Sequence, residues 1–520
     1  MAYFSEHATV LLCMVVYLIL LITFGWYLQR QAGKTVGEYY VANRRIPGWV
    51  VSLAFFSTFV STNTYIGQAG ESFRYGLSWT WVGVFWAVFC IISWQILGPR
   101  MRNQSIRLKS FTVPDYFQLR YQSGLSRSIR VLSAVIILFA TVWYMTGIAK
   151  GCAHLLHSLL DIPYAYGAAF MLFFTCFYTI AGGMYGIMWT DAVQGILMFI
   201  VAMVMLSLPF IYVGGYDALM TKIAFVEHVS KKGTPIGNGL VTFGQLTSFT
   251  YIVGIGLSIG MKQISEPKLL IRFYTVKDKA GMKFAMTWTP IFMGISLVCV
   301  MGLGALVHGM VTAEEAAQLI NNTDEVVGFM LKKFNNPLIS GICLMGLFAA
   351  GMAALASVTL VVGTTLVKDI WNVWKPMPAE RIIPRTKIAM LLYCIIVYYF
   401  TIFPPADVVE LSAFAGSVYV ASFFPTIFGG LYFRWGTDLG AVSSMLAGII
   451  VNIVWRFGVR SRFEGLSDIH EVFPAFLASF AAYVVVSLLT AHRKPTAAHL
   501  NTVFDTEPVL GATLLSQVKK

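Results

Sequence analysis

Polar side chains that could bind a small solute or an ion lie in the middle of an otherwise apolar stretch, Gly48–Gly70. The stretch is long enough to cross a bilayer, yet its centre reads Ser57-Thr58-Phe59-Val60-Ser61-Thr62-Asn63-Thr64. Inside a membrane, such a centre is tolerated only where protein or a water-filled cavity surrounds it. It predicts either a buried helix whose hydroxyls bond back to its own carbonyls, or a discontinuous helix whose freed carbonyls and hydroxyls meet a solute or an ion.

Two charged residues also lie in or beside apolar runs. Asp191 stands near the start of a run that follows the Gly182-Gly183 pair, and Lys262 stands near the end of the run 245–265. Charged side chains inside a membrane are costly, so they face the protein interior and mark solute or ion pathways. Lys262 has an alternative, because a lysine can snorkel to the inner surface.

The elements that must position these residues are membrane-spanning helices. The chain is 57% hydrophobic and 12% charged, with mean hydropathy +0.72, whereas soluble domains carry roughly 25% charged residues. Apolar runs of about 20 residues predict a polytopic all-α protein rather than a barrel. We expect about 13 such segments, near 9–28, 48–68, 76–97, 128–149, 162–182, 187–212, 245–265, 284–309, 337–367, 386–403, 407–431, 438–458 and 470–491.

The positive charge of the chain follows a membrane topology. An odd number of segments puts the two termini on opposite sides, and lysine and arginine favour the inner loops. The first eight residues contain neither, so we expect the N-terminus outside the cell and the tail 492–520 in the cytoplasm. The membrane we expect is the plasma (inner) membrane. The net charge of +13 is then mostly a topological bias, and it does not indicate a nucleic-acid partner.

Several functional classes lack support in the sequence. The seven cysteines have no CxxC spacing, so neither a disulfide framework nor a zinc site is indicated. There is no Walker A motif for an ATPase, and no HExxH motif for a metalloprotease. We expect no enzymatic activity, no organic cofactor and no obligatory protein partner.

The string Tyr178–Gln194, YTIAGGMYGIMWTDAVQ, resembles the signature of the sodium:solute symporter family. Other pieces resemble this family in the same order along the chain: Thr112–Tyr121, Pro267–Tyr274, Leu366–Trp371 and Phe414–Tyr432. The resemblance covers about 30–435, and the proline and pantothenate branches look most similar.

The resemblance implies the leucine-transporter fold in a single transporter domain, 1–520. Two inverted five-helix repeats, 48–212 and 245–431, would each begin with a helix broken at mid-membrane, where solute and ion bind. We expect the second break between Tyr251 and Ile264, where Gly254, Gly256 and Gly260 supply flexible backbone. The implied function is secondary transport of a small polar solute by alternating access, with sodium as the driving ion.

The chain departs from the family at the implied sodium site. The carbonyl ligands match Ser57, Val60 and Ala350, but the two hydroxyl ligands fall on Ala353 and Ala354. Sodium is a hard cation that needs about five or six oxygens, by extension from the rules for such cations. Because alanine offers no side-chain oxygen, the sodium site is atypical.

Several alternatives therefore stay open for the coupling ion. Asp191 could bind sodium together with water, or bind a proton instead, and Ser357, one turn after Ala353, allows a shifted site. The ammonium of Lys262 could pair with a substrate carboxylate, fill the cation site, or lose its proton. Sodium coupling, proton coupling and cation-independent exchange all remain possible.

The solute is expected to be a carboxylate or an amino acid. The candidate solute-binding residues are Thr58, Ser61, Asn63, Thr64, Trp81, Thr141, Trp143 and Lys262. Each of them alone also fits a packing role. A rival hypothesis is a solute sensor that keeps the transporter fold, but the tail is too short for a signalling domain.

Another group of charged residues is expected near the inner surface of the membrane. Arg44, Arg45, Arg120 and Arg272 should contact lipid headgroups and the inner gate, and Glu266 should lie at that gate.

Overall fold

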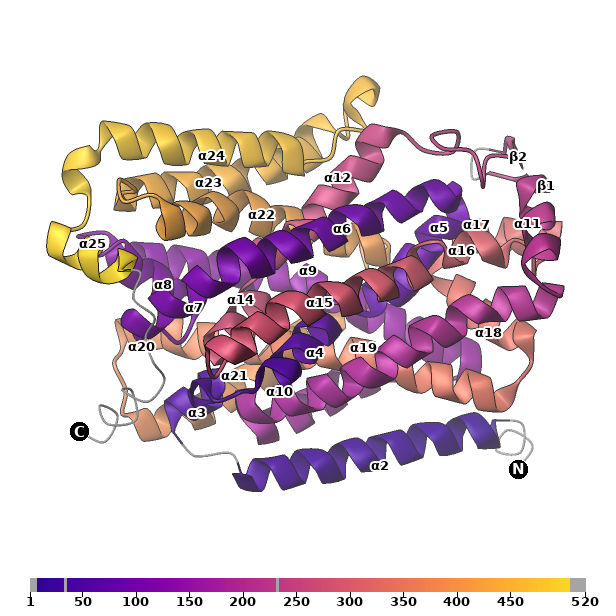
Figure 1. Cartoon of the computed structure of the whole chain (residues 1–520), viewed down its shortest axis with the longest axis horizontal. Coiled ribbons are helices and arrows are strands. Elements are labelled where there is room, and N and C mark those ends of the chain that lie inside the picture. The colour runs from indigo at the N-terminus through magenta and orange to yellow at the C-terminus, as the bar shows by residue number, and fades with distance from the viewer. Residues whose placement is uncertain (1–6, 32–34, 231–232, 506–520) are drawn as a thin grey trace.

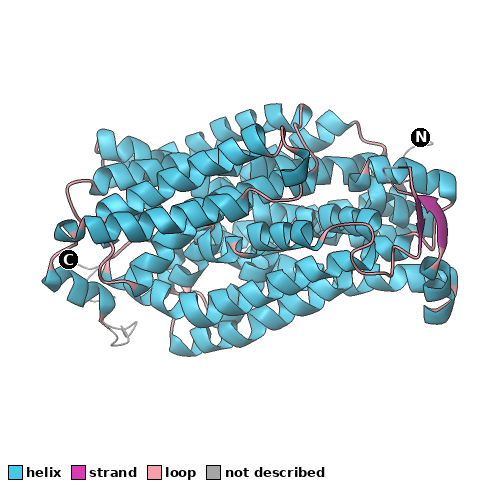
Figure 2. Ribbon diagram, turned by 90° about the horizontal axis from the view of Figure 1, so that it is seen from above, coloured by secondary structure: helices cyan, strands magenta, loops and turns pink. Residues whose placement is uncertain are grey.

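Long helices lying side by side make up almost the whole molecule (Figure 1). The structure is a computed structural model, and it describes residues 7–31, 35–230 and 233–505. Within this part of the chain, ten helices are long and apolar enough to cross a membrane. Seen from above, the bundle carries a single small pair of strands at one end (Figure 2). The predicted all-α membrane fold is therefore confirmed.

The main helices follow the predicted segments closely. They are α2 (Ala8–Gln31), α4 (Gly48–Phe59), α6 (Thr80–Ile92), α9 (Ser126–Leu160), α10 (Tyr164–Val213), α12 (Phe249–Gly260), α15 (Lys279–Met301), α19 (Pro337–Thr364), α21 (Ala379–Ile402), α22 (Val408–Tyr432), α23 (Asp438–Val454) and α24 (Val472–Leu489).

Shorter helices extend or connect these. They are α3 (Val36–Val41), η1 (Ala42–Arg44), η2 (Asn63–Gln68), α5 (Ala69–Tyr75), η3 (Gly76–Trp79), η4 (Ser93–Leu97), α7 (Gly98–Arg107), α8 (Val113–Arg120), α11 (Tyr216–Ala224), α13 (Lys262–Ser265), α14 (Pro267–Thr275), α16 (Leu303–Val307), α17 (Ala313–Asn321), η5 (Thr323–Glu325), α18 (Val326–Phe334), η6 (Thr365–Trp371), α20 (Asn372–Trp374), η7 (Trp455–Val459), η8 (Glu464–Leu466), η9 (Ala491–Arg493) and α25 (Ala497–Phe504). Strands β1 (Val226–Val229) and β2 (Pro235–Gly237) pair antiparallel.

Helix α10 contains two of the predicted segments. They meet at Gly183, whose backbone (φ +57°, ψ −164°) is not helical. A side chain there would also begin 2.7 Å from the ring of Tyr39, so the position requires glycine. With α10 counted as two segments, and with both broken helices included, the structure is consistent with thirteen segments.

The first broken helix has the discontinuous structure that the polar stretch allowed. Helix α4 ends at Phe59, and Val60 (φ −78°, ψ 83°) leaves the helical conformation. The chain resumes as a π-helix, η2, and continues into α5. Every residue of α4 except Trp49 is buried, where the helix packs against α10, α15 and α19.

The second broken helix differs from the prediction in where it breaks. The three glycines expected at the break lie in α12, which ends at Gly260, and they allow close packing, as at Gly256 against Phe85. Met261 separates α12 from α13 but keeps helical angles (φ −66°, ψ −15°). The chain instead becomes extended at Glu266 (φ −79°, ψ 124°), directly before Pro267. A proline disfavours the helical conformation of the residue before it, which explains the position of the break.

The two described ends of the chain lie at opposite ends of the bundle. Helix α2 begins at the end that also carries α11, β1, β2 and α17, whereas α25 lies at the other end, beside α7 and α8 (Figure 1). The predicted tail 492–520 is described only as far as residue 505.

Candidate functional site

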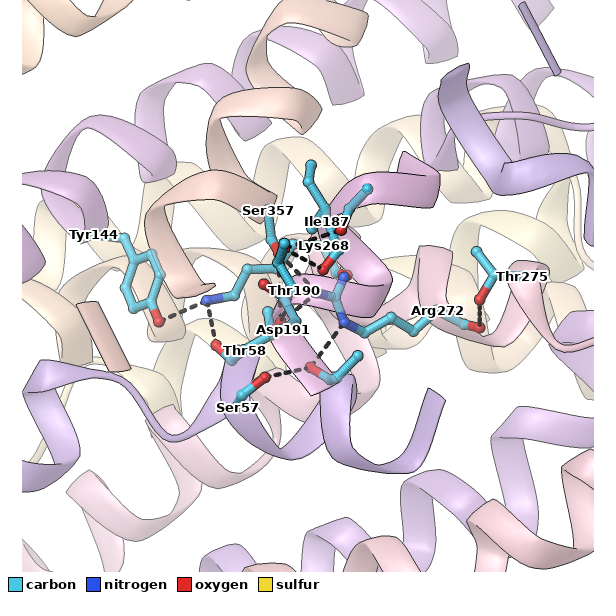
Figure 3. Close-up of polar contacts among 12 residues, drawn as sticks. Ser57, Thr58, Tyr144, Ile187, Thr190, Asp191, Lys268, Arg272, Thr275 and Ser357 are labelled. Atoms are coloured by element: carbon cyan, nitrogen blue, oxygen red, sulfur yellow. Dashed lines mark hydrogen bonds and ion pairs between the residues drawn. The ribbon is translucent and has the colours of Figure 1, made fainter. Parts of the chain in front are cut away.

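Arg272 of α14 stands at the centre of a polar network that joins four helices (Figure 3). Its guanidinium donates to the carboxylate of Asp191 in α10 and to the hydroxyl of Thr58 in α4. It also donates to the hydroxyl of Ser357 in α19, at 2.7 Å, and to the carbonyl of Ala54 in α4, at 3.2 Å. The network therefore links the first broken helix with α10, α14 and α19.

The ion pair between Arg272 and Asp191 is fully buried. A buried charge is tolerated when it is paired and hydrogen-bonded, and removing one partner leaves the other uncompensated. The predicted contact of Arg272 and Arg120 with lipid headgroups is wrong, because both side chains are buried, and their predicted place at the inner gate stays a prediction. Arg120 is also buried, and it donates to the carbonyls of Gly430 at 2.7 Å and Phe433 at 2.9 Å.

Lys268 lies beside this network and caps the end of α4. Its ammonium nitrogen is 3.1 Å from the Thr58 carbonyl oxygen and 2.6 Å from the hydroxyl of Tyr144 in α9 (Figure 3). The last carbonyls of a helix lack partners within the helix, and the helix dipole favours a cation there. Sequence analysis did not single out Lys268 or Tyr144, although the lysine stands inside the Pro267–Tyr274 string.

Lys262 and Glu266 complete a group of buried charges around Tyr144. The ammonium nitrogens of Lys262 and Lys268 lie 3.7 Å and 3.8 Å from the centroid of the tyrosine ring. Glu266 pairs with both lysines, with nitrogen–oxygen distances of 3.7 Å to Lys262 and 3.5 Å to Lys268. All four side chains are buried. Lys262 therefore does not snorkel to the surface.

The buried charges at the two breaks do not balance. Lys262, Lys268 and Arg272 contribute three positive charges, whereas Asp191 and Glu266 contribute two negative ones. One positive charge therefore lacks a counter-ion within this group when all five residues are ionised. A buried, uncompensated charge is unfavourable unless a ligand of opposite charge pairs with it or the group becomes neutral.

Two of the predicted solute-binding residues have buried polar atoms that lack partners. The amide oxygen of Asn63 and the hydroxyl of Thr64 have no hydrogen-bond partner within the part of the chain that the structure describes. Both belong to η2, directly after the first break, and η2 packs against α9 and α22. Ser61, at the break itself, is also buried.

The remaining predicted solute residues have other contacts in the structure. Trp81 is 46% exposed and contacts the ring of Phe243, so the structure does not bring it to the breaks. The hydroxyl of Thr141 is 2.7 Å from that of Tyr419. Trp143 packs against aromatic side chains of the neighbouring helices, at 5.2 Å and 6.3 Å between ring centroids.

The comparisons with known proteins agree with this architecture. Residues 39–448 match the profile of the sodium:solute symporter family. The chain belongs to this family. It is a multi-pass membrane protein and a secondary transporter of the cation-coupled symporter class, and the family makes sodium the coupling ion to expect.

Two similar relatives are bacterial proline transporters. The chain is 26% identical over 496 residues to a sodium/proline symporter of Staphylococcus aureus (strain USA300), covering 93% of this chain and 92% of that protein. It is 23% identical over 488 residues to the osmoregulated proline transporter OpuE of Bacillus subtilis (strain 168), covering 92% and 95%.

The solved structures support the leucine-transporter fold. A Na⁺-coupled sialic acid symporter matches with TM-score 0.74 at 16% identity, covering 93% of this chain and 97% of that chain. The nucleobase-cation symporter Mhp1 matches with TM-score 0.55 at 11% identity, covering 89% and 97%. At these identities the likeness shows the fold alone.

The residues at the family's sodium position do not fit a sodium ion. Ala353 and Ala354 are fully buried in α19, and they present methyl groups where hydroxyl ligands are expected. Of the other side-chain oxygens proposed for this site, Asp191 Oδ2 and the Ser357 hydroxyl are already bound by the Arg272 guanidinium, and Asp191 Oδ1 has no hydrogen-bond partner among the described residues. Together with the expected carbonyls of Ser57, Val60 and Ala350, Asp191 Oδ1 still supplies fewer than the about five or six oxygens that sodium needs.

Proposed function

We propose that the solute of this transporter is a small carboxylate, bound between the two broken helices. The observation that carries this proposal is the set of buried ionisable groups, in which the three basic residues Lys262, Lys268 and Arg272 face only two acidic ones, Asp191 and Glu266. A carboxylate that entered the site would supply the missing negative charge. Charge-assisted hydrogen bonds from lysine ammonium groups would then fix its orientation.

The polar residues of η2 support the same site. Asn63 and Thr64 each keep a buried polar atom without a partner among the described residues, and such atoms cost free energy unless a ligand pairs with them. A solute with a hydroxyl or carbonyl group near its carboxylate would satisfy both residues. The site therefore favours a polar carboxylate over a purely aliphatic one.

An amino acid is the second candidate solute. The relatives described above are named for proline transport. In this chain, the Oε2 atom of Glu266 has no hydrogen-bond partner within the described residues, so it could accept from a solute amine. Against this candidate, the two lysines beside Glu266 would repel a positively charged amine.

We propose that transport proceeds by alternating access between the repeats 48–212 and 245–431. The contacts of Lys268 and Arg272 with α4 join the first helix of one repeat to the first helix of the other. Solute binding at this junction would change the relative stability of the outward and inward states, as linkage requires.

We also propose that the N-terminus faces outward. The bundle end that carries α3, α7, α8 and α25 (Figure 1) holds many basic side chains, such as Arg45, Arg100 and Arg107, and basic residues favour the cytoplasmic side. Labelling of single cysteines with a membrane-impermeant reagent tests this. Gly244→Cys should react from outside and Gly124→Cys should not, and the reverse pattern would contradict the proposal.

Uptake into proteoliposomes tests the solute proposal. The purified chain would be offered a panel of labelled small carboxylates, each paired with its neutral amide, together with proline. We expect saturable uptake of at least one carboxylate, and none of its amide. If the neutral amides are carried as well as the acids, the role of the positive charge is wrong. If no solute accumulates or exchanges, the transport proposal itself fails.

A further inference from the structure

The seam where α4 packs against α19 is contacted by two basic side chains of α14, Lys268 at the Thr58 carbonyl and Arg272 at the Ser357 hydroxyl. We infer that the Lys268 ammonium and the Arg272 guanidinium take the place of the sodium ion, so that this transporter works without binding sodium there. The inference rests on the proposed transport function, but it does not depend on the identity of the solute.

The first reason is the loss of oxygen ligands from α19. Ala353 and Ala354 provide no side-chain oxygen, and the nearest hydroxyl along the helix is that of Ser357, one turn away. This hydroxyl accepts a hydrogen bond from Arg272 at 2.7 Å and donates one to Asp191 at 3.1 Å. A sodium ion shifted toward Ser357 would therefore have to displace a guanidinium.

The second reason is the charge of the side chain that occupies the seam. A guanidinium is positively charged at every physiological pH, and it donates without accepting. Arg272 binds Asp191, the carboxylate proposed for the cation site, and also the Thr58 hydroxyl and the Ala54 carbonyl of α4. It thus uses oxygens that could bind a sodium ion, and its charge repels one.

The third reason is the position of Lys268 at the end of α4. Its ammonium is 3.1 Å from the Thr58 carbonyl, one of the groups at the broken end of the helix. Half-helix C-termini are the places where transporters of this kind bind their cations. A lysine from α14 supplies the positive charge at this end from within the chain.

A tethered cation differs from sodium in one essential respect. Sodium drives a solute only through the coupling free energy between two ligands that bind and dissociate. Lys268 and Arg272 can hold α4, α10 and α19 together, but they cannot dissociate into the cytoplasm. The sodium gradient therefore supplies no driving force through this seam.

Binding of ²²Na⁺ to the purified full-length chain tests the inference without any solute. We expect no saturable ²²Na⁺ binding, and the same unfolding temperature in sodium chloride as in choline chloride at equal concentration. Saturable binding, or a rise of the unfolding temperature specific to sodium, would overturn the inference. Because neither measurement uses a solute, a failure of the carboxylate proposal would not affect the result.

A pair of variants tests whether Lys268 is the residue that excludes sodium. The triple variant Lys268→Met/Ala353→Ser/Ala354→Thr restores two hydroxyls and removes the ammonium, whereas the control Ala353→Ser/Ala354→Thr keeps the ammonium. We expect saturable ²²Na⁺ binding in the triple variant, at least tenfold above the control. Equal binding in both would show that Lys268 does not replace sodium. A folded triple variant that binds no sodium would overturn the role of Lys268 and assign the exclusion of sodium to Arg272, which the triple variant retains. If the triple variant does not fold, the wild-type measurements still decide the inference.

Discussion

The Lys268 ammonium lies 3.1 Å from the Thr58 carbonyl oxygen and so connects the two broken helices directly. The contact spans 210 residues of sequence, and it is buried at both ends. Because Thr58 stands one residue before the end of α4, any movement of the first broken helix must break this bond or carry α14 with it. The contact is therefore a direct route by which the two halves of the site can act on each other.

Replacing Lys262 by methionine should weaken carboxylate binding. The substitution keeps the length of the side chain and removes one of the three positive charges, after which the group of five residues would be neutral without a ligand. Hydrogen bonds to charged groups contribute about 1.5–3 kcal/mol, so KM for uptake should rise about tenfold or more. Lys262→Arg is the control and should retain most of the affinity. Equal loss in both variants would indicate a packing role.

Replacing Tyr144 by phenylalanine should impair transport without unfolding the protein. The ring remains for the two lysines, but Lys268 loses the hydroxyl that lies 2.6 Å from its ammonium nitrogen. An unpaired donor on a buried ammonium costs about 1.5–3 kcal/mol, so we expect uptake to fall about tenfold.

The matched control for this experiment is Trp81→Phe. Trp81 is exposed and lies away from the breaks, so its substitution should leave KM within about twofold, since exposed positions contribute little. A larger effect at Trp81 than at Tyr144 would contradict the placement of the solute site.

Removing the carboxylate of Asp191 should destabilise the protein strongly. Asp191→Asn leaves the buried Arg272 guanidinium without its counter-ion, and breaking a buried pair in this way costs about 3–5 kcal/mol. The unfolding temperature in detergent should fall accordingly.

A partly exposed ion pair provides the comparison for Asp191→Asn. Glu315 and Lys333 lie 2.7 Å apart with side chains 26% and 27% exposed, and surface pairs of this kind contribute about 0.2–1 kcal/mol. Glu315→Gln also keeps the capping interaction at the start of α17. If both substitutions lower the unfolding temperature equally, the buried Asp191–Arg272 pair contributes no more to stability than a surface pair.

Much of the fold could be predicted from local sequence properties. Apolar runs of the right length indicate membrane helices, and the polar centre of Gly48–Gly70 indicated the first break because no lipid-facing helix would contain it. The second break lies at Glu266 and not at the glycines of α12, because the residue before a proline, here Pro267, is the one forced out of the helix.

The charged network could not be predicted in the same way. Arg272 and Asp191 are 81 residues apart, and no periodicity relates them, so an arginine near a predicted membrane boundary was assigned to lipid headgroups. The contact of Lys268 could not be predicted for the same reason, because its partner Thr58 lies on another helix. Such contacts follow from how α14 packs against α4, which depends on the whole bundle.

The glycine at the centre of the family signature should not tolerate a side chain. Gly183 has φ +57° and ψ −164°, a region that costs other residues about 1–3 kcal/mol, and a Cβ there would begin 2.7 Å from the Tyr39 ring. Gly183→Ala should therefore lower the unfolding temperature clearly. The neighbouring Gly182→Ala is the control, because a Cβ there would meet nothing nearer than 4.0 Å. If Gly182→Ala is as destabilising as Gly183→Ala, the turn between the two halves of α10 does not depend on this backbone conformation.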